Sequence, residues 1–349
     1  MHSRLYPTLL RPGLFRLPPE QAHDLVMTML ARASRHRALL RLLPAPPAAL
    51  AGPVTVAGLP FPNRIGLAAG FDKNGVALPA WERLGFGFAE IGTITAKAQP
   101  GNPRPRIFRY PKNQALINRL GFNNLGADQV AGILARHRQQ GWPRIVVGIN
   151  LGKSKTTPLE EAVDDYLYSL ERLHRFADYL VLNVSSPNTP NLRSLQHGEA
   201  LRALLSAVQN HALQQSSPRP VFLKIAPDLN ETALSEILET ASAAKISGLI
   251  ATNTTLDHNA VAGAGDETGG LSGAPLKEKA EEVLNFLRQH SDLPLIGVGG
   301  IMNGDDVRER FAAGADLLQI YTGFVYGGPP LLSELLLSER QHRPHPTVS

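Results

Sequence analysis

A polar segment follows one apolar run of this chain and carries a dense set of hydroxyl and amide side chains. The run Tyr179 to Leu182 is typical of a buried strand, and Pro187 and Pro190 end that strand and stiffen the loop after it. The loop offers neutral donors and acceptors, namely Asn183, Ser185, Ser186, Asn188 and Thr189. Such a set suits a flat, polar, uncharged ring, whereas Asn and Ser in an ordinary turn only satisfy backbone groups. This segment alone leaves both interpretations open.

Lys224 is the charged residue of an otherwise apolar strand candidate, Phe222 to Ala226. A lysine there needs an anionic or electron-rich partner. One such partner is the N1–C2=O edge of a flavin, which gains negative charge on reduction. A Schiff base with a carbonyl substrate is a second use, and an ammonium that reaches past its neighbours into solvent is a third.

Glycines and small polar residues follow the last two strand candidates, as Gly299-Gly300 and as Tyr321-Thr322-Gly323. In barrels of alternating strands and helices, these two loops commonly bind phosphate through backbone N–H groups and a helix N-terminus. A tight turn from strand to helix is the alternative interpretation.

A second set of amides lies in the segment Asn118 to Asn124. Together with Asn183, Asn188, Asn253 and Thr254, Asn118 would give one site several side chains that both donate and accept hydrogen bonds. That pattern matches the alternating C=O and N–H groups of a pyrimidinedione. Lys73 adds a cation suited to a carboxylate, while Asn123 and Asn124 are expected to adopt left-handed turns.

Short apolar runs alternate with helical patterns along the chain. The strand candidates are 65–69, 88–92, 145–149, 179–184, 221–225, 249–252, 295–298 and 317–320, and the helical patterns are 76–84, 127–138, 163–176, 201–214, 232–244, 276–290 and 305–313. Continuous apolar strands between helices indicate a parallel sheet that is covered on both faces. Eight such units favour an α/β fold of the closed (β/α)₈ TIM barrel type.

The predicted barrel gathers the polar residues that follow its strands on one face, where barrel enzymes place their active sites. These residues are Asp72, Lys73, Thr93, Asn150, Asn183, Lys224, Thr252, Asn253, Gly299, Gly300, Tyr321 and Thr322. Two insertions stand out, 95–124 after the second strand and 258–273 after the sixth. The first is long enough to fold over the mouth of the barrel.

The composition sets limits on the class of protein. Of 349 residues, 43% are hydrophobic and 19% are charged, which predicts a folded chain with a substantial core. The absence of cysteine excludes disulfides, thiolate metal sites and a cysteine nucleophile or acid, and it is compatible with a cytosolic location. No apolar run approaches the roughly 18 residues of a membrane span. No histidine–carboxylate cluster has the spacing of a metal site, so no metal is expected.

Residues 1–43 are expected to form a separate unit. They hold seven arginines against Glu20 and Asp24, which accounts for the formal charge of +5, and the balance elsewhere argues against nucleic-acid binding. A helix that begins near Pro19 would place apolar residues on one face, namely Ala22, Leu25, Val26, Met29, Leu30 and Ala33. This face either lies on an anionic membrane surface or packs on the main domain. We expect a linker at 44–53, the barrel at 54–340 and a tail at 341–349.

Several of these motifs resemble those of the dihydroorotate dehydrogenase family, in its class 2, quinone-dependent and membrane-associated branch. They are Gly66-Leu67-Ala68-Ala69-Gly70-Phe71-Asp72-Lys73-Asn74, Ile117-Asn118-Arg119-Leu120-Gly121-Phe122-Asn123-Asn124, Asn183-Val184-Ser185-Ser186-Pro187-Asn188-Thr189-Pro190, Ala251-Thr252-Asn253-Thr254-Thr255 and Gly297-Val298-Gly299-Gly300-Ile301. The resemblance covers nearly the whole chain, including the N-terminal extension.

The resemblance implies a flavoprotein of pyrimidine biosynthesis that binds FMN and oxidises dihydroorotate to orotate. Residues implied to contact FMN are Ala69, Gly70, Phe71, Asp72, Lys73, Thr93, Asn150, Asn183, Lys224, Thr252, Gly273, Gly300, Tyr321 and Thr322. Residues implied to surround the substrate are Lys73, Asn118, Arg119, Leu120, Gly121, Phe122, Asn183, Asn188, Asn253 and Thr254. Ser186 matches the base that removes the C5 proton while hydride leaves C6.

The resemblance also implies a membrane quinone as the final electron acceptor, with His23, Arg109 and Tyr321 near its access tunnel. A start at Met1 without a transit peptide fits a bacterial-type peripheral enzyme, a monomer on the cytoplasmic face of the inner membrane. Other FMN barrels that reduce dihydropyrimidines or dihydrouridine resemble a cysteine-acid design, which a chain without cysteine does not fit. A basic membrane- or RNA-binding protein on an inert barrel is the non-enzyme alternative.

Overall fold

The computed structural model describes residues 5–47, 50, 52–264 and 267–341. Its centre is a closed barrel of parallel strands in the order β10-β12-β13-β3-β4-β7-β8-β9. The strands are β3 (Ile65–Leu67), β4 (Phe88–Ile94), β7 (Val146–Leu151), β8 (Tyr179–Asn183), β9 (Val221–Ile225), β10 (Gly248–Ala251), β12 (Leu295–Val298) and β13 (Leu317–Ile320). Every residue of these strands is buried, as expected for strands covered on both faces. The predicted (β/α)₈ barrel is therefore confirmed.

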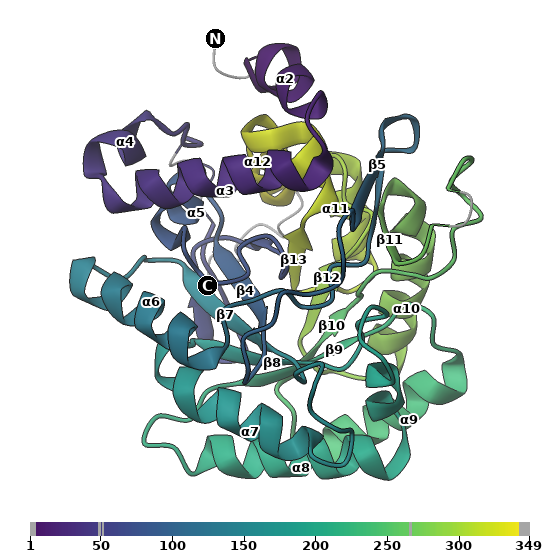
Figure 1. Cartoon of the computed structure of the whole chain (residues 1–349). Coiled ribbons are helices and arrows are strands. Elements are labelled where there is room, and N and C mark those ends of the chain that lie inside the picture. The colour runs from purple at the N-terminus through teal and green to yellow at the C-terminus, as the bar shows by residue number, and fades with distance from the viewer. Residues whose placement is uncertain (1–4, 48–49, 51, 265–266, 342–349) are drawn as a thin grey trace, which may run out of the picture.

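Helices follow the strands and surround the barrel (Figure 1). They are α5 (Leu78–Leu84), α6 (Ala127–Gln140), α7 (Ala162–Leu173), α8 (Gly198–Leu213), α9 (Glu231–Ala243), α10 (Lys277–His290), α11 (Gly304–Ala312) and α12 (Thr322–Gln341). The helix α12 bends at Gly328, which has a φ of 62° and is followed by Pro329 and Pro330. The predicted tail lies outside the described residues except for Gln341.

The two insertions build a small antiparallel sheet of their own, with the strand order β11-β6-β5. The strands β5 (Ile107–Tyr110) and β6 (Ala115–Asn118) come from the first insertion, and β11 (Gly270–Gly273) comes from the second. Leu271 pairs with Ile117 across this sheet. A separate hairpin, β1 (Val54–Val56) with β2 (Leu59–Phe61), precedes the barrel.

The N-terminal residues form short helices at one end of the molecule, beside α12 (Figure 1). They are η1 (Tyr6–Leu10), α2 (Arg11–Phe15), α3 (Pro19–Arg35) and α4 (Arg37–Leu42). The apolar face predicted for α3 is buried in one part and exposed in another. Leu30 is 8% exposed and belongs to the main core, whereas Leu25 and Met29 are 46% and 63% exposed. The helix therefore packs on the main domain and still exposes large apolar side chains. No helix in the described ranges is long and apolar enough to cross a membrane.

Polar contacts attach this helical unit to the barrel. The Glu20 carboxylate of α3 accepts from Arg106 Nη2 at 2.8 Å, just before β5. Ser34 Oγ accepts from the backbone N–H of Ala80 at 3.2 Å, in α5. The Tyr6 hydroxyl donates to the Val325 carbonyl of α12 at 2.6 Å. The N-terminal helices thus have a defined position over the mouth of the barrel.

Candidate functional site

The carboxyl ends of the barrel strands open into a cavity under the small antiparallel sheet. Of the residues predicted for cofactor, substrate and catalysis, those in its wall are Ala69, Gly70, Lys73, Thr93, Asn118, Leu120, Gly121, Phe122, Asn183, Ser186, Asn188, Lys224, Thr252, Asn253, Thr254, Gly273, Gly300, Tyr321 and Thr322. They come from the ends of seven barrel strands, all except β7, and from both insertions. The structure therefore brings together residues spread over more than two thirds of the chain.

Hydrogen bonds between buried side chains orient Asn183, the last residue of β8, which directly precedes the serine loop (residues 184–191). Asn183 Nδ2 donates to Thr93 Oγ1 at 2.9 Å and to Asn150 Oδ1 at 3.2 Å. Thr93 Oγ1 in turn donates to Asn150 Oδ1 at 2.5 Å. Asn183 Oδ1 accepts from Ser185 Oγ at 3.0 Å. Because these groups are buried and hydrogen-bonded to one another, their geometry is held without a ligand.

Lys224 is 4% exposed and contacts a carboxylate inside the barrel. Its Nζ lies 3.2 Å from Glu90 Oε1, and Glu90 is completely buried. Glu90 also accepts from Asn150 Nδ2 at 2.7 Å and from Gln319 Nε2 at 2.6 Å. The ammonium therefore does not extend into solvent, which excludes that interpretation of Lys224.

Glu90 and Gln319 are site residues that the sequence interpretation missed. Each is a polar residue within an apolar strand, β4 or β13, and this was the same signal that singled out Lys224. Gln319 lines the cavity, and its Oε1 is buried without a hydrogen-bond partner among the described residues. A buried acceptor of this kind is rare unless a ligand or water completes it.

Ser186 lies in the cavity wall and is 5% exposed. In the described part of the chain, its Oγ has one hydrogen bond, which it accepts from the backbone N–H of Asn188 at 3.2 Å. Asn188 Nδ2 donates to the Asn118 carbonyl at 3.1 Å and so joins the serine loop to the first insertion. The serine hydroxyl is therefore free to donate toward the cavity.

Lys73 supplies the cavity with a positive charge. Among the described residues, its ammonium has no hydrogen-bond or ion-pair partner. Burial lowers its pKa to about 8, and the charge of Arg106 adds to this, whereas Asp24, Glu20 and Asp72 oppose it. An anionic ligand group is the partner that such a buried ammonium requires.

The segment after β6 contributes Leu120, Gly121 and Phe122 to the cavity wall, but Arg119, which was predicted there, does not line it. Arg119 points away, with its Nη1 2.6 Å from Glu267 Oε2 and its guanidinium over the Phe108 ring. The expectation of left-handed turns at Asn123 and Asn124 was wrong. Gly121 and Phe122 have the positive φ angles, 69° and 53°.

The reason lies in the side-chain contacts of Asn124. Its Oδ1 accepts from Gly126 N at 2.7 Å and its Nδ2 donates to Thr95 Oγ1 at 2.8 Å. The amide of Asn124 therefore joins the two ends of the first insertion. The left-handed backbone angles lie instead at Gly121 and Phe122.

Three residues predicted to contact the cofactor do not line the cavity. Asp72 is buried, and its carboxylate accepts from Val76 N, Ala77 N and Trp81 Nε1, so it shapes the loop after β3. Asn150 is buried, and its Oδ1 accepts from Thr93 Oγ1 and Asn183 Nδ2 and so orients these two wall residues. The Phe71 ring faces the N-terminal helices, 5.1 Å from the Tyr321 ring.

The loops after β12 and β13 meet at the start of α12. Gly300 has a φ of 73°, and a Cβ there would lie 2.3 Å from Lys277 Cα, so both backbone angle and packing require glycine. Thr322 and Gly323, the first residues of α12, line the same cavity as Gly300. A helix start without intrahelical partners for its N–H groups is a site for phosphate.

A second cavity of about 990 Å³ lies between the N-terminal helices and the barrel. Its wall is largely apolar, with Leu, Val, Phe and Pro side chains from α2, α3 and α12, and it contains His23, Arg109 and Tyr321. Burial lowers the pKa of His23 well below its usual value, and the charge of Lys73 adds to this effect. The three residues predicted near a tunnel thus line one apolar cavity.

The two cavities share a wall formed by Ile107, Leu116 and Tyr321. Arg109 holds α2 at the edge of the second cavity, because its Nη2 donates to the Phe15 carbonyl at 2.8 Å and to the Leu17 carbonyl at 3.0 Å. The polar cavity is therefore separated from the apolar one by a layer of side chains.

Comparison with known proteins agrees with this geometry. The model of the family described as dihydroorotate dehydrogenase matches residues 52–338. A relative named dihydroorotate dehydrogenase (quinone), from Gloeobacter violaceus, is 50% identical over 335 residues, which are 95% of this chain and 92% of the relative. Another of the same name, from Burkholderia pseudomallei, is 48% identical over 342 residues, which are 96% of this chain and 98% of the relative.

Solved structures give the same result. DHODH from Eimeria tenella in complex with ferulenol superposes with a TM-score of 0.83 at 37% identity, covering 92% of this chain and 90% of that one. Its ligand-free form superposes with a TM-score of 0.84 at 38% identity and covers 92% and 93% of the two chains. The chain therefore belongs to the dihydroorotate dehydrogenase family and, within it, to the quinone-dependent branch.

Proposed function

We propose that this chain oxidises dihydroorotate to orotate in pyrimidine biosynthesis, with FMN as its bound cofactor and a membrane quinone as the final oxidant. The observation that carries the proposal is the convergence of Lys73, Asn183, Ser186 and Lys224 on one cavity whose wall includes the start of α12. Membership of the quinone-dependent branch supports the choice of substrate and oxidant.

The residues present fit FMN. The ammonium of Lys224, the unpartnered Gln319 Oε1 and the amide of Asn183 suit the polar edge of an isoalloxazine ring. Gly300 and the first N–H groups of α12 suit the phosphate. When bound, FMN would supply the acceptor for the hydride that leaves C6 of the substrate.

The substrate would be held by complementary groups. The Lys73 ammonium would pair with the carboxylate, and the amides of Asn118, Asn188 and Asn253 would bind the C=O and N–H groups of the ring. Bound in this way, the ring is oriented before the reaction, which lowers the barrier by removing rotational freedom.

Ser186 would act as the base and take the proton from C5. Loss of that proton from C5 and of hydride from C6 leaves the C5=C6 double bond of orotate, so the substrate loses two hydrogens. Thr189, in the same loop, is 5% exposed and can pass the proton onward from the serine through water.

The second cavity would admit the quinone. Seven of the twelve large apolar side chains that the described residues expose lie within residues 5–42, namely Leu5, Leu9, Leu10, Leu25, Met29, Leu39 and Leu42. An exposed apolar patch of this kind, next to Arg16, Arg32, Arg35, Arg37 and Arg41, is typical of peripheral contact with an anionic membrane surface. We place the enzyme on the cytoplasmic face of a bacterial inner membrane.

Anaerobic spectroscopy of the purified protein tests the proposal. The protein should be yellow, release FMN on denaturation and bleach at its flavin absorbance band when dihydroorotate is added. Colour should return when a quinone is added in detergent. A protein that binds flavin but does not bleach with dihydroorotate would contradict the proposed substrate, and flavin-free protein would contradict the cofactor.

A further inference from the structure

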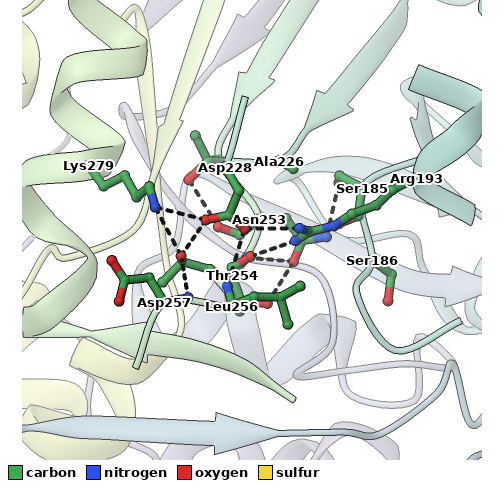
Figure 2. Close-up of polar contacts among 12 residues, drawn as sticks. Ser185, Ser186, Arg193, Ala226, Asp228, Asn253, Thr254, Leu256, Asp257 and Lys279 are labelled. Atoms are coloured by element: carbon green, nitrogen blue, oxygen red, sulfur yellow. Dashed lines mark hydrogen bonds and ion pairs between the residues drawn. The ribbon is translucent and has the colours of Figure 1, made fainter. Parts of the chain in front are cut away.

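An arginine after the serine loop connects that loop to two others. Arg193 lies in η5 (Leu192–Gln196), and its side chain is 23% exposed. Its guanidinium donates from Nε to the Ser185 carbonyl at 3.1 Å and from Nη2 to the Thr254 carbonyl at 3.1 Å. Its Nη1 lies 2.9 Å from Asp228 Oδ2 (Figure 2). One planar group thus joins the loops that follow β8, β9 and β10.

One carbonyl belongs to the neighbour of a cavity-wall residue, and the other belongs to a wall residue, Thr254. Ser185 precedes Ser186, and Thr254 follows Asn253. The two loops also touch directly, because Asn253 Nδ2 donates to Ser185 Oγ at 3.0 Å. Since a guanidinium is rigid and its donors point in fixed directions, its two carbonyl bonds set the separation of these loops.

Asp228 holds the guanidinium in place. Its Oδ1 accepts from Thr255 Oγ1 at 2.5 Å and lies 3.0 Å from Lys279 Nζ, on α10. Its Oδ2 also accepts from the backbone N–H of Leu256 at 3.2 Å. Burial raises the pKa of Asp228, but the hydrogen bonds from Thr255, Lys279 and Arg193 outweigh it and bring the pKa below its usual value. The carboxylate is therefore charged near neutral pH.

Ser186 itself takes no part in this network (Figure 2). Among the described residues, its hydroxyl has only the local contact with Asn188 N. The location of Ser186 Oγ therefore depends on the backbone of its own loop. Arg193 holds that backbone at the adjacent peptide carbonyl.

We infer that Arg193, anchored by Asp228, is a positioning residue for proton abstraction by Ser186. It sets the distance between the serine and the substrate ligands Asn253 and Thr254. This inference rests on the proposed function. Loss of the guanidinium should let the serine loop shift relative to the bound ring, and a displacement of about 1 Å can cost on the order of a hundredfold in rate.

Arg288 provides a matched control. Its guanidinium also binds two backbone carbonyls and one aspartate, namely Gly314 O at 3.0 Å, Ser291 O at 3.4 Å and Asp316 Oδ2 at 2.9 Å. These contacts lie before β12 and β13, at the end of the barrel opposite the cavity. Arg193→Met and Arg288→Met therefore remove equivalent contacts and differ in their distance from the site.

The experiment measures the limiting rate of flavin bleaching by dihydroorotate, per bound flavin, in a stopped-flow instrument. Arg193→Met should lower this rate about tenfold to a hundredfold. Arg288→Met should leave it unchanged. Reoxidation of the flavin by quinone should keep its rate in both variants, because it needs no proton transfer to Ser186. The bleaching rates of Arg193→Lys and Asp228→Asn should lie between those of the wild type and Arg193→Met.

Equal bleaching rates in Arg193→Met and Arg288→Met would overturn the inference. If Arg193→Met does not retain flavin, Arg193→Lys and Asp228→Asn test the inference in its place. Wild-type bleaching rates in both of these variants would overturn the inference. A wild-type protein that dihydroorotate fails to bleach would instead refute the proposed function, so the two failures are distinguishable.

Discussion

The two cavities on either side of Tyr321 are built in opposite ways. The cavity at the mouth of the barrel is made from strand ends, and buried hydrogen bonds hold its polar side chains, as in the Asn183, Thr93 and Asn150 set. The cavity beneath α3 is made from short helices and apolar side chains, and Leu25 and Met29 of α3 stay exposed. Chemistry on a polar ring requires fixed donors, whereas a lipid-soluble oxidant requires an apolar route.

The shared wall is what allows two such different sites to cooperate. Ile107, Leu116 and Tyr321 each contribute to both cavities, and Lys73 and His23 lie on opposite sides of it. Burial lowers the pKa of His23 in the apolar cavity, and the charge of Lys73 in the polar cavity lowers it further. A neutral histidine fits a site for an uncharged quinone. The following predictions test this division, from the largest expected effect to the smallest.

Replacing Ser186 by alanine tests whether the polar cavity contains the base. Flavin reduction by dihydroorotate should slow by about a thousandfold, within the range that general base catalysis contributes. Flavin content and reoxidation by quinone should stay normal, because Ser186 lies outside the apolar cavity. Stopped-flow bleaching and reoxidation measure the two halves separately, and near-normal bleaching would remove Ser186 from its role.

Deleting residues 1–43 should affect the other cavity alone. Quinone turnover in detergent should fall by more than about tenfold, since loss of about 1.4 kcal/mol of quinone binding suffices for that. Bleaching by dihydroorotate should persist and serves as the folding control. Unimpaired quinone turnover would contradict the assignment of quinone access to the apolar cavity.

Arg109→Met in the full-length protein tests the same cavity with less disturbance. The backbone carbonyls of Phe15, at the end of α2, and of Leu17, just after it, would lose their donor, and α2 would no longer be held at the cavity edge. We expect the same selective loss of quinone turnover at a smaller magnitude. An equal loss of bleaching by dihydroorotate would show that the two cavities are not separable.

The pH dependence of orotate binding should report the charge of Lys73. Its pKa of about 8 is lowered from the usual value, so the ammonium is charged at lower pH and loses its proton as the pH rises through 8. The dissociation constant of orotate should therefore be flat near neutral pH. Above pH 8 the dissociation constant should rise by up to about tenfold per pH unit. A flavin-absorbance titration measures it, and Lys73→Met should bind weakly with no such rise.

Local patterns were enough to predict the barrel and most of the polar cavity. The strands β9, β12 and β13 have the predicted bounds, because short apolar runs between helical patterns have few other stable structures. Ser186 and Gly300 were identified because each follows a strand, and barrel topology alone brings such positions to one face. Lys224 was identified because it is the charged residue of an otherwise apolar strand. The family motifs were contiguous stretches and could be read without any contact information.

Contacts between distant segments were decided by the tertiary structure. Pairing of Leu271 with Ile117 joins two insertions, and that pairing depends on closure of the barrel beneath them. The same closure brings Glu90 and Gln319 together, and it leaves Arg119 pointing away although its neighbours line the cavity. A sequence determines which residues are apolar or polar and where strands end. The direction of each side chain and its partner across the barrel follow only once the whole core is packed, because each depends on neighbours that are distant along the chain.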